Sequence, residues 1–166
     1  MLTKWEKVGN RLITLFNKYM LIGEYIHTID AKNRISMPAK FRAELGKKII
    51  ITPGLDSCLF IFTQSEWVKV SKRLSDADAD LSFLKADQRS FNRYMFGRAA
   101  EVEIDSIGRI LIPDFLKDRI GLKNSAAVIG VKDRVEIWND KVWSQNQEAV
   151  EKRASALAES LGNNKK

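Results

Sequence analysis

Apolar and polar positions along this chain follow one pattern that occurs twice. An apolar run at residues 25–29 predicts a strand, a polar turn follows, and the alternating residues 34–37 predict a return strand. A similar run at residues 100–104 begins the second copy. Four residues recur at a constant spacing of 75 positions: Asp30, Arg34, Ile35 and Pro38 correspond to Asp105, Arg109, Ile110 and Pro113. Because internal repetition determines architecture, the sequence predicts one structural unit present twice.

Local signals specify the turn and the helix that follows it. Asp30 is suited to cap its own backbone in a turn, and Asn33 tolerates a positive φ. Gly108 stands in the place of Asn33 in the second copy, which indicates a left-handed backbone position there. Pro38 is expected to open a short helix that ends at Gly46.

The later part of each copy also matches, with one extra residue in between. Strands are predicted at residues 48–52 and 58–62. Thr63 and Glu66 have the spacing of a capping box, which predicts a helix through residue 74. This segment corresponds to the one around residues 137–143 at a spacing of 76 positions.

These patterns divide the chain into five parts. We predict an N-terminal extension at residues 1–19, a first repeat at 20–74, a connecting helix at 75–96, a second repeat with a C-terminal helix at 97–162, and a disordered tail at 163–166. The C-terminal helix is expected to begin near Asn139 and to end at Gly162. Residues 1–19 leave two interpretations open: an interfacial or nucleic-acid-binding helix, or an extension ahead of a natural start at Met20.

Composition limits the class of protein. A hydrophobic fraction of 45% in 166 residues is typical of a soluble globular chain. Each copy has about fifty residues, near the lower limit for independent folding, so we expect the copies to share one core. The single cysteine, Cys58, excludes an intrachain disulfide and fits a reducing compartment. We find no apolar run long enough to span a bilayer and no signal-peptide layout.

The net charge of +7 is distributed unevenly. Residues 20–52 hold six basic and three acidic side chains, whereas residues 101–140 hold six basic and eight acidic ones. The first copy is therefore the basic one, and a basic surface favours an anionic partner such as DNA, RNA or an acidic membrane.

Two turns of the form Asp-x-x-(Asn/Gly)-Arg, each with a proline four residues after its arginine, carry a family resemblance. They resemble the swapped-hairpin DNA-binding modules of the AbrB class. The tandem arrangement, with Phe41-Arg42 after the first proline and Phe96-Gly97-Arg98-Ala99 before the second turn, resembles the MraZ family over residues 20–160. Two departures are Asn33, where the first motif of that family usually has glycine, and the extension before Met20.

The resemblance implies both a fold and a function. Proteins of the MraZ family are bacterial transcriptional regulators that bind short direct repeats upstream of a cell-division and cell-wall gene cluster. Their two half-modules form one pseudo-symmetric barrel, and their protomers assemble into rings. For this chain the resemblance implies a mainly β fold with peripheral helices (α+β), built as a duplicated swapped-hairpin β-barrel.

The candidate DNA-binding residues are basic side chains around the first turn: Lys32, Arg34, Lys40 and Arg42. If the turn and the helix start share a face, these side chains form a cationic surface. Lysine neutralises phosphate as a point charge, and arginine can also pair with a guanine edge. The second copy has Ile107, Arg109, Phe115 and Lys117 at the equivalent positions, so two basic residues are lost. We therefore expect the first copy to carry most of the DNA contact, with Arg109 as a further candidate.

An alternative interpretation of both arginines is structural. Asp30 with Arg34, and Asp105 with Arg109, could clamp their turns without any ligand. We predict Asp30, Asn33, Asp105 and Gly108 as structural turn residues in either case.

Catalytic and metal chemistry find little support in the sequence. His27 is the only histidine, and Cys58 has no possible catalytic partner besides it. We find no zinc-ligand spacing, phosphate-binding glycine loop or nucleophile elbow. The aspartates between residues 76 and 87 lack the glycine that a calcium loop needs. We predict that the chain is no enzyme and uses no metal, no cofactor and no small-molecule substrate.

The sequence and the resemblance together predict a cytoplasmic, nucleoid-associated regulator of transcription. Its expected partners are double-stranded DNA and further copies of the chain in a ring-shaped homo-oligomer, without a membrane. The alternative is a homo-oligomeric scaffold ring whose basic face binds RNA or a protein partner. A steep linear fall of log K with log salt, at a site that outlasts competitor DNA, would favour the regulator.

Overall fold

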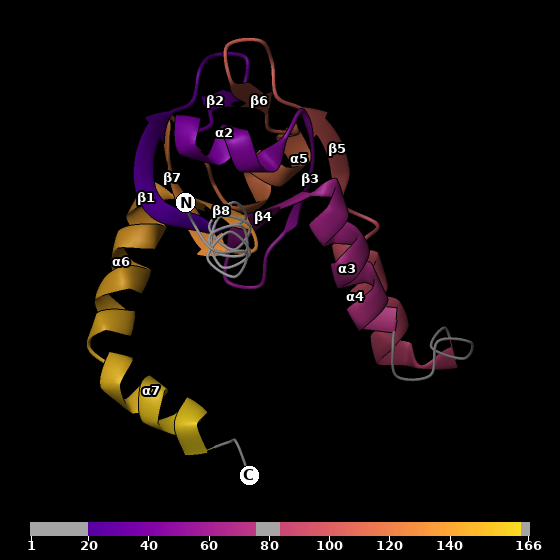
Figure 1. Cartoon of the computed structure of the whole chain (residues 1–166), viewed down its shortest axis with the longest axis vertical. Helices are drawn as coiled ribbons and strands as arrows, with labels where there is room; N and C mark the ends of the chain where they lie inside the picture. Colours follow the sequence, from indigo (N-terminus) through magenta and orange to yellow (C-terminus); the bar gives the residue numbers. More distant parts are fainter. Residues whose placement is uncertain (1–19, 76–83, 164–166) are drawn as a thin grey trace, which may run out of the picture.

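The computed structural model describes residues 20–75 and 84–163, and it has mixed α and β architecture (Figure 1). The elements of the first repeat are β1 (Leu21–Thr28), β2 (Arg34–Ser36), α2 (Ala39–Leu45), β3 (Lys48–Pro53), β4 (Cys58–Thr63) and α3 (Gln64–Ser75). After α4 (Ala86–Met95), the second repeat contributes β5 (Ala100–Glu103), β6 (Arg109–Leu111), α5 (Asp114–Arg119), β7 (Ser125–Lys132), β8 (Val135–Asn139) and α6 (Asp140–Glu151). The helix α7 (Ala154–Asn163) follows. The two repeats have the same order of elements, and the predicted α+β class is confirmed.

Strands of the two repeats are interleaved. Six of them form an antiparallel sheet in the order β1-β7-β8-β4-β3-β5, while β2 and β6 form a separate antiparallel pair. The first strand of each repeat pairs with the third strand of the other, as β1 with β7 and β5 with β3. The strands are thus exchanged between repeats, as the resemblance implied. No pair joins the edge strands β1 and β5 in the described part of the chain, so a closed barrel is not found.

A pseudo-two-fold axis relates the repeats. The counterparts in the two repeats are β1 and β5, β3 and β7, and β4 and β8. In the large sheet each strand lies as far from one edge as its counterpart lies from the other edge. Equivalent residues face each other at two places: Ile35 opposite Ile110 between β2 and β6, and Phe60 opposite Glu136 between β4 and β8. The axis passes through these two pairs, so the repeats meet at the centre of both sheets.

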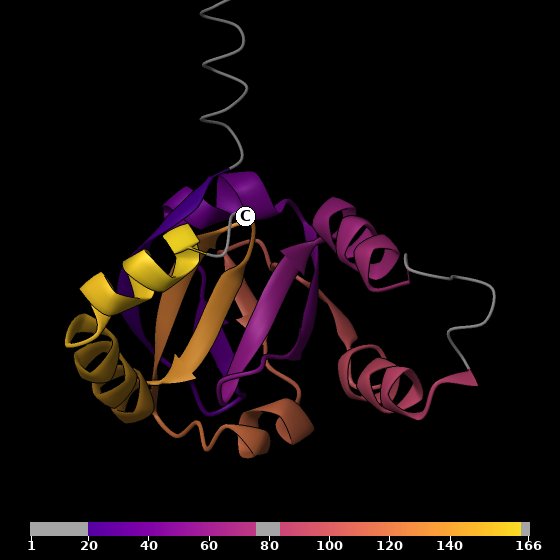
Figure 2. The same cartoon turned by 90° about the horizontal axis from the view of Figure 1, so that it is seen from below.

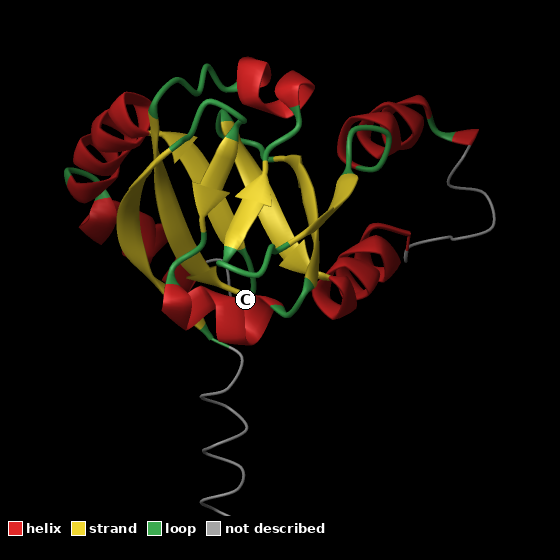
Figure 3. Ribbon diagram, turned by 90° about the horizontal axis from the view of Figure 1, so that it is seen from above, coloured by secondary structure: helices red, strands yellow, loops and turns green. Residues whose placement is uncertain are grey.

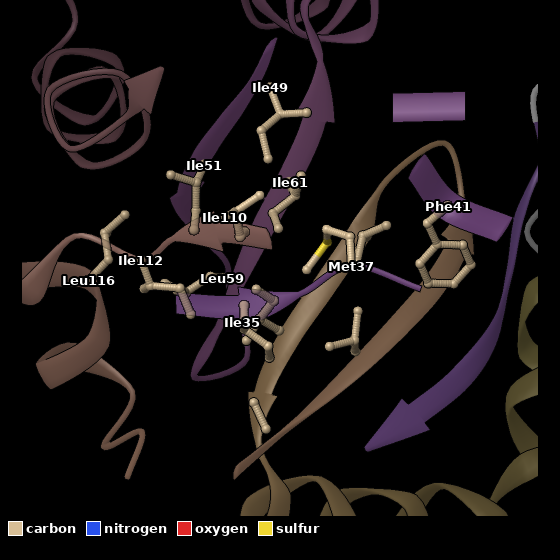
Figure 4. Close-up of a cluster of buried hydrophobic side chains, with 14 of the residues drawn as sticks. Ile35, Met37, Phe41, Ile49, Ile51, Leu59, Ile61, Ile110, Ile112 and Leu116 are labelled. Atoms are coloured by element: carbon tan, nitrogen blue, oxygen red, sulfur yellow. The ribbon is translucent and has the colours of Figure 1, made fainter. Parts of the chain in front are cut away.

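One hydrophobic core lies between the large sheet and the β2–β6 pair (Figure 4). Ile35 and Ile110 lie on the axis, and both are 0% exposed. Phe41 of α2 and Leu116 of α5 belong to the same cluster, and these two helices lie on opposite sides of the molecule (Figure 2). Because the core takes side chains from both repeats, neither repeat can enclose it alone.

A second hydrophobic cluster covers the outer face of the large sheet. Successive side chains of a strand point to opposite faces, so β4 sends Cys58, Phe60 and Phe62 into this cluster and Leu59 and Ile61 into the first core. The ring of Trp67 on α3 lies 5.7 Å from that of Phe62, and the ring of Trp143 on α6 lies 5.5 Å from that of Trp138. The matching tryptophans therefore pack against the sheet in both repeats.

Cys58 is a core residue of the second hydrophobic cluster. Its side chain is 1% exposed, and burial, with a smaller contribution from Glu136, raises the pKa of its thiol to about 12. The thiolate is the nucleophilic form of cysteine, and at neutral pH Cys58 is held as the thiol.

The C-terminal helix differs from its prediction. The structure breaks it at residues 152 and 153 into α6 and α7, whereas a single helix to Gly162 was expected. All residues from 148 to 163 are exposed, so no tertiary packing supports one continuous helix. The first half of α6 packs on the large sheet, and the rest of α6 with α7 extends away from it as an arm (Figure 1). The apolar residues Val150, Leu157 and Leu161 of this arm stay exposed.

Several predictions concern residues that the structure does not describe. They are the interpretations of residues 1–19, the roles of the aspartates before Leu84, and the tail after Asn163. The connecting helix α4 begins at Ala86 behind Lys85, which offers no side-chain cap. None of the helices in residues 20–75 and 84–163 is long and apolar enough to cross a membrane.

Candidate nucleic-acid interface

The two Asp-to-Arg turns lie side by side at one end of the molecule (Figure 1). We name residues 30–33 the first loop, residues 105–108 the second loop, and these loops with the β2–β6 pair the loop end. The backbone N–H of Met37 donates to the carbonyl of Gly108 (2.8 Å), and that of Ile112 donates to the carbonyl of Asn33 (2.9 Å). Each loop is thus bonded to the residue directly after the strand that follows the other loop, which fixes the relative position of the two loops.

One aspartate closes the first loop. Asp30 Oδ1 accepts hydrogen bonds from the backbone N–H groups of Lys32 (2.9 Å) and Arg34 (3.0 Å). Its Oδ2 accepts a third from Arg34 Nε (2.8 Å) and lies 2.7 Å from Arg34 Nη2. The carboxylate therefore ties the backbone and the guanidinium group together.

The second loop repeats this arrangement. Asp105 Oδ1 accepts from the N–H groups of Ile107 (3.1 Å) and Arg109 (2.8 Å), and its Oδ2 accepts from Arg109 Nε (2.9 Å). The structural clamps that the sequence offered as an alternative are present in both repeats. Any role of the arginines toward a ligand is additional to this one.

The clamps also connect the loops electrostatically. Arg109 Nη1 lies 3.7 Å from Asp30 Oδ2, besides the 2.8 Å between Arg109 Nη2 and Asp105 Oδ2. The side chains of Arg34 and Arg109 remain 31% and 25% exposed. The two arginines therefore face solvent in part, but their charges are balanced by two carboxylates.

These contacts lower the pKa values of the carboxyl groups. For Asp30 the hydrogen bonds from the side chain and backbone of Arg34 outweigh desolvation and bring the pKa from 3.8 to about 2. For Asp105 the backbone hydrogen bond of Arg109, followed by its side-chain bond, lowers the pKa as well. A carboxyl with a depressed pKa in the folded chain stabilises it above its unfolded pKa, and that stabilisation is lost as pH falls through the folded pKa.

The first clamp should therefore persist in acid. We expect Asp30 to stay ionised at pH 3 and to be protonated only as pH falls to about 2. The carboxyl chemical shift of Asp30, followed by NMR through an acid titration, measures this directly. In an Arg34→Ala control the titration should move up toward 3.8. Titration of the unsubstituted chain near 3.8 would contradict the clamp.

Both loops contain a left-handed residue, as predicted. Asn33 has a φ of 58° and Gly108 has a φ of 86°. A Cβ atom at position 108 would also collide with the guanidinium group of Arg42. The positive φ favours glycine in the second loop, and the flexible end of the Arg42 side chain would have to move for any other residue. In the first loop the side chain of Asn33 bonds the loop to α5: its Nδ2 donates to Asp114, and its Oδ1 accepts from Lys117 Nζ (2.6 Å).

The helix that meets each loop comes from the other repeat. Lys117 of α5 reaches the first loop at Asn33, and Arg42 of α2 reaches the second loop, where its Nη1 lies 3.5 Å from the carbonyl oxygen of Ile107. Arg42 and Lys117 are equivalent positions of the repeats, so the pseudo-two-fold axis relates these contacts. From the sequence, Arg42 was expected beside the first loop, and Lys117 and Asp114 were not expected there.

The basic residues singled out in the sequence are consequently divided between the loops. Lys32 is exposed in the first loop, and Arg42 lies against the second. Lys40 is exposed in the first turn of α2. It follows Met37, whose N–H is bonded to the second loop, by three residues. With Lys117, the loop end has basic residues on both sides of the axis. Figure 3 views this end from above.

In the part of the chain that the structure describes, no group of three or more His, Cys, Asp or Glu side chains is placed to hold a metal ion. His27 on β1 stacks on Tyr25, with ring centroids 6.3 Å apart. What the loop end offers is cations and hydrogen-bond donors.

Comparisons with known proteins agree on one family. A family model described as "MraZ protein, putative antitoxin-like" matches the chain twice, at residues 20–94 and 95–163. A protein of Caldanaerobacter subterraneus subsp. tengcongensis named "Transcriptional regulator MraZ" is 42% identical over 144 residues, which are 87% of this chain and 98% of that protein. Proteins of the same name from Thermoanaerobacter sp. and Syntrophomonas wolfei are 43% and 42% identical over 142 residues, which are 86% of this chain and 96% of each relative. The doubled family match and these identities show that the chain belongs to the MraZ family.

Proposed function

We propose that this chain is a sequence-specific DNA-binding regulator of transcription that acts on the promoter of a division and cell-wall gene cluster. The observation that carries the proposal is the loop end, where two clamped loops and basic residues from both repeats project together. The name of the relatives, transcriptional regulator, supports it.

The shape of the loop end suits the major groove of DNA. Ile35 and Ile110 point into the core, so the alternating neighbours Arg34, Ser36, Arg109 and Leu111 form the outer face of the β2–β6 pair. The major groove admits a two-stranded β-ribbon. In the proposed complex Lys32, Lys40, Arg42 and Lys117 neutralise phosphates. Arg34 and Arg109 retain N–H groups beyond those that their aspartates use, and these face the bases.

Both repeats contribute to this surface. The sequence alone assigned most of the DNA contact to the first copy, but the exchanged contacts of Arg42 and Lys117 place one helix cation at each loop. We therefore propose that the two loops bind DNA together, one on each side of the pseudo-two-fold axis.

Self-association is the second part of the proposal. Large apolar side chains are exposed on the α6–α7 arm and along the edge strand β1, namely Val150, Leu157, Leu161, Ile22 and Ile26. These surfaces would be covered by further copies in a ring-shaped oligomer. Few cations per protomer give modest affinity, and binding several direct repeats at once would raise it through multivalency. The closed barrel, the repeat boundaries at 20–74 and 97–162, and a location at the nucleoid in the cytoplasm remain predictions that accompany this proposal.

A gel shift with the DNA directly upstream of the chain's own gene tests the proposal. We expect a shift that survives excess unrelated DNA, with log K falling linearly with log salt. Arg34→Ala should abolish the shift and leave the oligomer intact in sedimentation, whereas Arg73→Ala, an exposed arginine on α3, should bind normally. Loss of the oligomer in Arg34→Ala would assign this residue to the clamp alone. Equal binding of unrelated RNA would favour the scaffold.

A further inference from the structure

The tips of the two loops have the same geometry but different chemistry. Lys32 and Ile107 occupy equivalent positions, and each donates its backbone N–H to the clamping aspartate, at 2.9 and 3.1 Å. The lysine side chain is exposed, and that of Ile107 is 62% exposed. The clamp therefore presents a cation on one side of the pseudo-two-fold axis and a branched apolar side chain on the other.

Two arginines lie near Ile107. The Nη1 of Arg42 lies 3.5 Å from its carbonyl oxygen, and the Arg109 guanidinium group is bonded to Asp105 at the start of the same loop. Two more large apolar side chains are exposed at this end, Leu111 (51%) and Phe115 (50%), where the first repeat has Ser36 and Lys40. All three apolar residues thus come from the second repeat. A surface that combines exposed cations with exposed apolar side chains fits a partner with anionic rims and apolar groups between them.

The major groove of DNA has this combination. Phosphates line both of its sides, and each thymine presents a C5-methyl group that apolar side chains contact. We propose that Ile107 is a specificity-determining residue that packs against thymine methyl groups, while Lys32, at the equivalent tip, contacts phosphate or guanine. This inference rests on the proposed function, because it requires the loop end to face DNA.

Unlike tips have a consequence for the orientation of the protein on DNA. Two-fold symmetric DNA-binding proteins read palindromic sites. A loop end with one cationic and one apolar tip distinguishes the two directions along the duplex. Each protomer would therefore bind its site in one orientation, and thymines would be required on the side of the second loop.

The experiment compares two versions of the fragment upstream of the chain's own gene, one synthesised with thymine and one with deoxyuridine, which lacks only the methyl group. We expect the unsubstituted protein to bind the uracil fragment about fourfold more weakly for each methyl group contacted, from the usual stabilisation by a buried methyl. Ile107→Ala should bind the thymine fragment more weakly than the unsubstituted protein and should bind both fragments equally. Ile107→Lys, which makes the tips alike, should keep its affinity through the added cation and also lose the discrimination.

Leu55→Ala is the matched control, because Leu55 is an apolar residue with 64% exposure in the turn between β3 and β4. This turn lies at the end of the sheets opposite the loop end (Figure 1). It should discriminate between the fragments like the unsubstituted protein. Equal binding of both fragments by the unsubstituted protein, or undiminished discrimination in Ile107→Ala, would overturn the inference and leave the proposed function standing. A change in oligomer mass in Ile107→Ala would instead assign the residue to a subunit contact. Failure to bind the thymine fragment at all would overturn both proposals.

Discussion

Replacing Lys32, Lys40 and Arg42 together by alanine is expected to weaken binding to the upstream fragment about a hundredfold near physiological salt. Each phosphate that a protein neutralises contributes close to one unit to the slope of log K against log salt. Three lost contacts therefore reduce the slope by about 2.7. Fluorescence anisotropy over a series of salt concentrations measures both quantities.

A matched variant shows whether the loss of DNA affinity depends on the position of the removed cations or on the total charge. Lys72, Arg73 and Lys85 are exposed on or next to α3 and α4, two helices that lie away from the loop end (Figure 1). Their replacement also removes two lysines and one arginine. We expect a change of less than threefold in affinity from this control. If both triple variants weaken binding equally, net charge and not the loop end attracts DNA.

Ile35→Ala and Ile110→Ala should each lower the free energy of unfolding by about 2–5 kcal/mol. Both side chains are 0% exposed and face each other on the pseudo-two-fold axis, so each substitution leaves a cavity where the repeats meet. The double variant should lose less than the sum of the single losses, because adjoining cavities share a wall and can relax together. Urea denaturation followed by circular dichroism gives these free energies.

Leu111→Ala is the control for the isoleucines, because Leu111 lies next to Ile110 on β6 but is 51% exposed. Its effect should stay within about 0.5 kcal/mol. Independent unfolding of the two halves, seen as two transitions of which each isoleucine affects one, would contradict a shared core.

The loops were predictable from the sequence because the residues that form them are close together in the chain. Asp30 and Arg34 are four residues apart, so the hydrogen bonds between them are local contacts. The left-handed backbone conformation was predictable because equivalent positions of the two loops hold Asn33 and Gly108, the residue types that best tolerate a positive φ. The capping interaction at the start of α3 is also local, with the N–H of Glu66 donating to Thr63 Oγ1 (3.1 Å). For these features the pattern of one short segment was sufficient.

Other features depend on contacts between distant segments. The α6–α7 break was missed because an apolar stripe predicts a helix without showing whether anything packs against it. The positions of Arg42 and Lys117 were missed for a related reason. Apolar and polar side chains alternate along β1 and β3, and this pattern fits a partner strand from the same repeat as well as one from the other repeat. The hydrophobic pattern alone therefore does not select the pairing.

By itself, the sequence determined that one unit occurs twice and that each unit has a turn closed by its own aspartate and arginine. Only the tertiary structure decided which helix meets which loop. The β1–β7 and β3–β5 pairs exchange the two halves, so the second repeat supplies Lys117 to the first loop and receives Arg42 at its own. The physical reason is that these contacts join residues 65 and 84 positions apart and depend on the packing of distant segments, whereas a turn is stabilised by its own side chains.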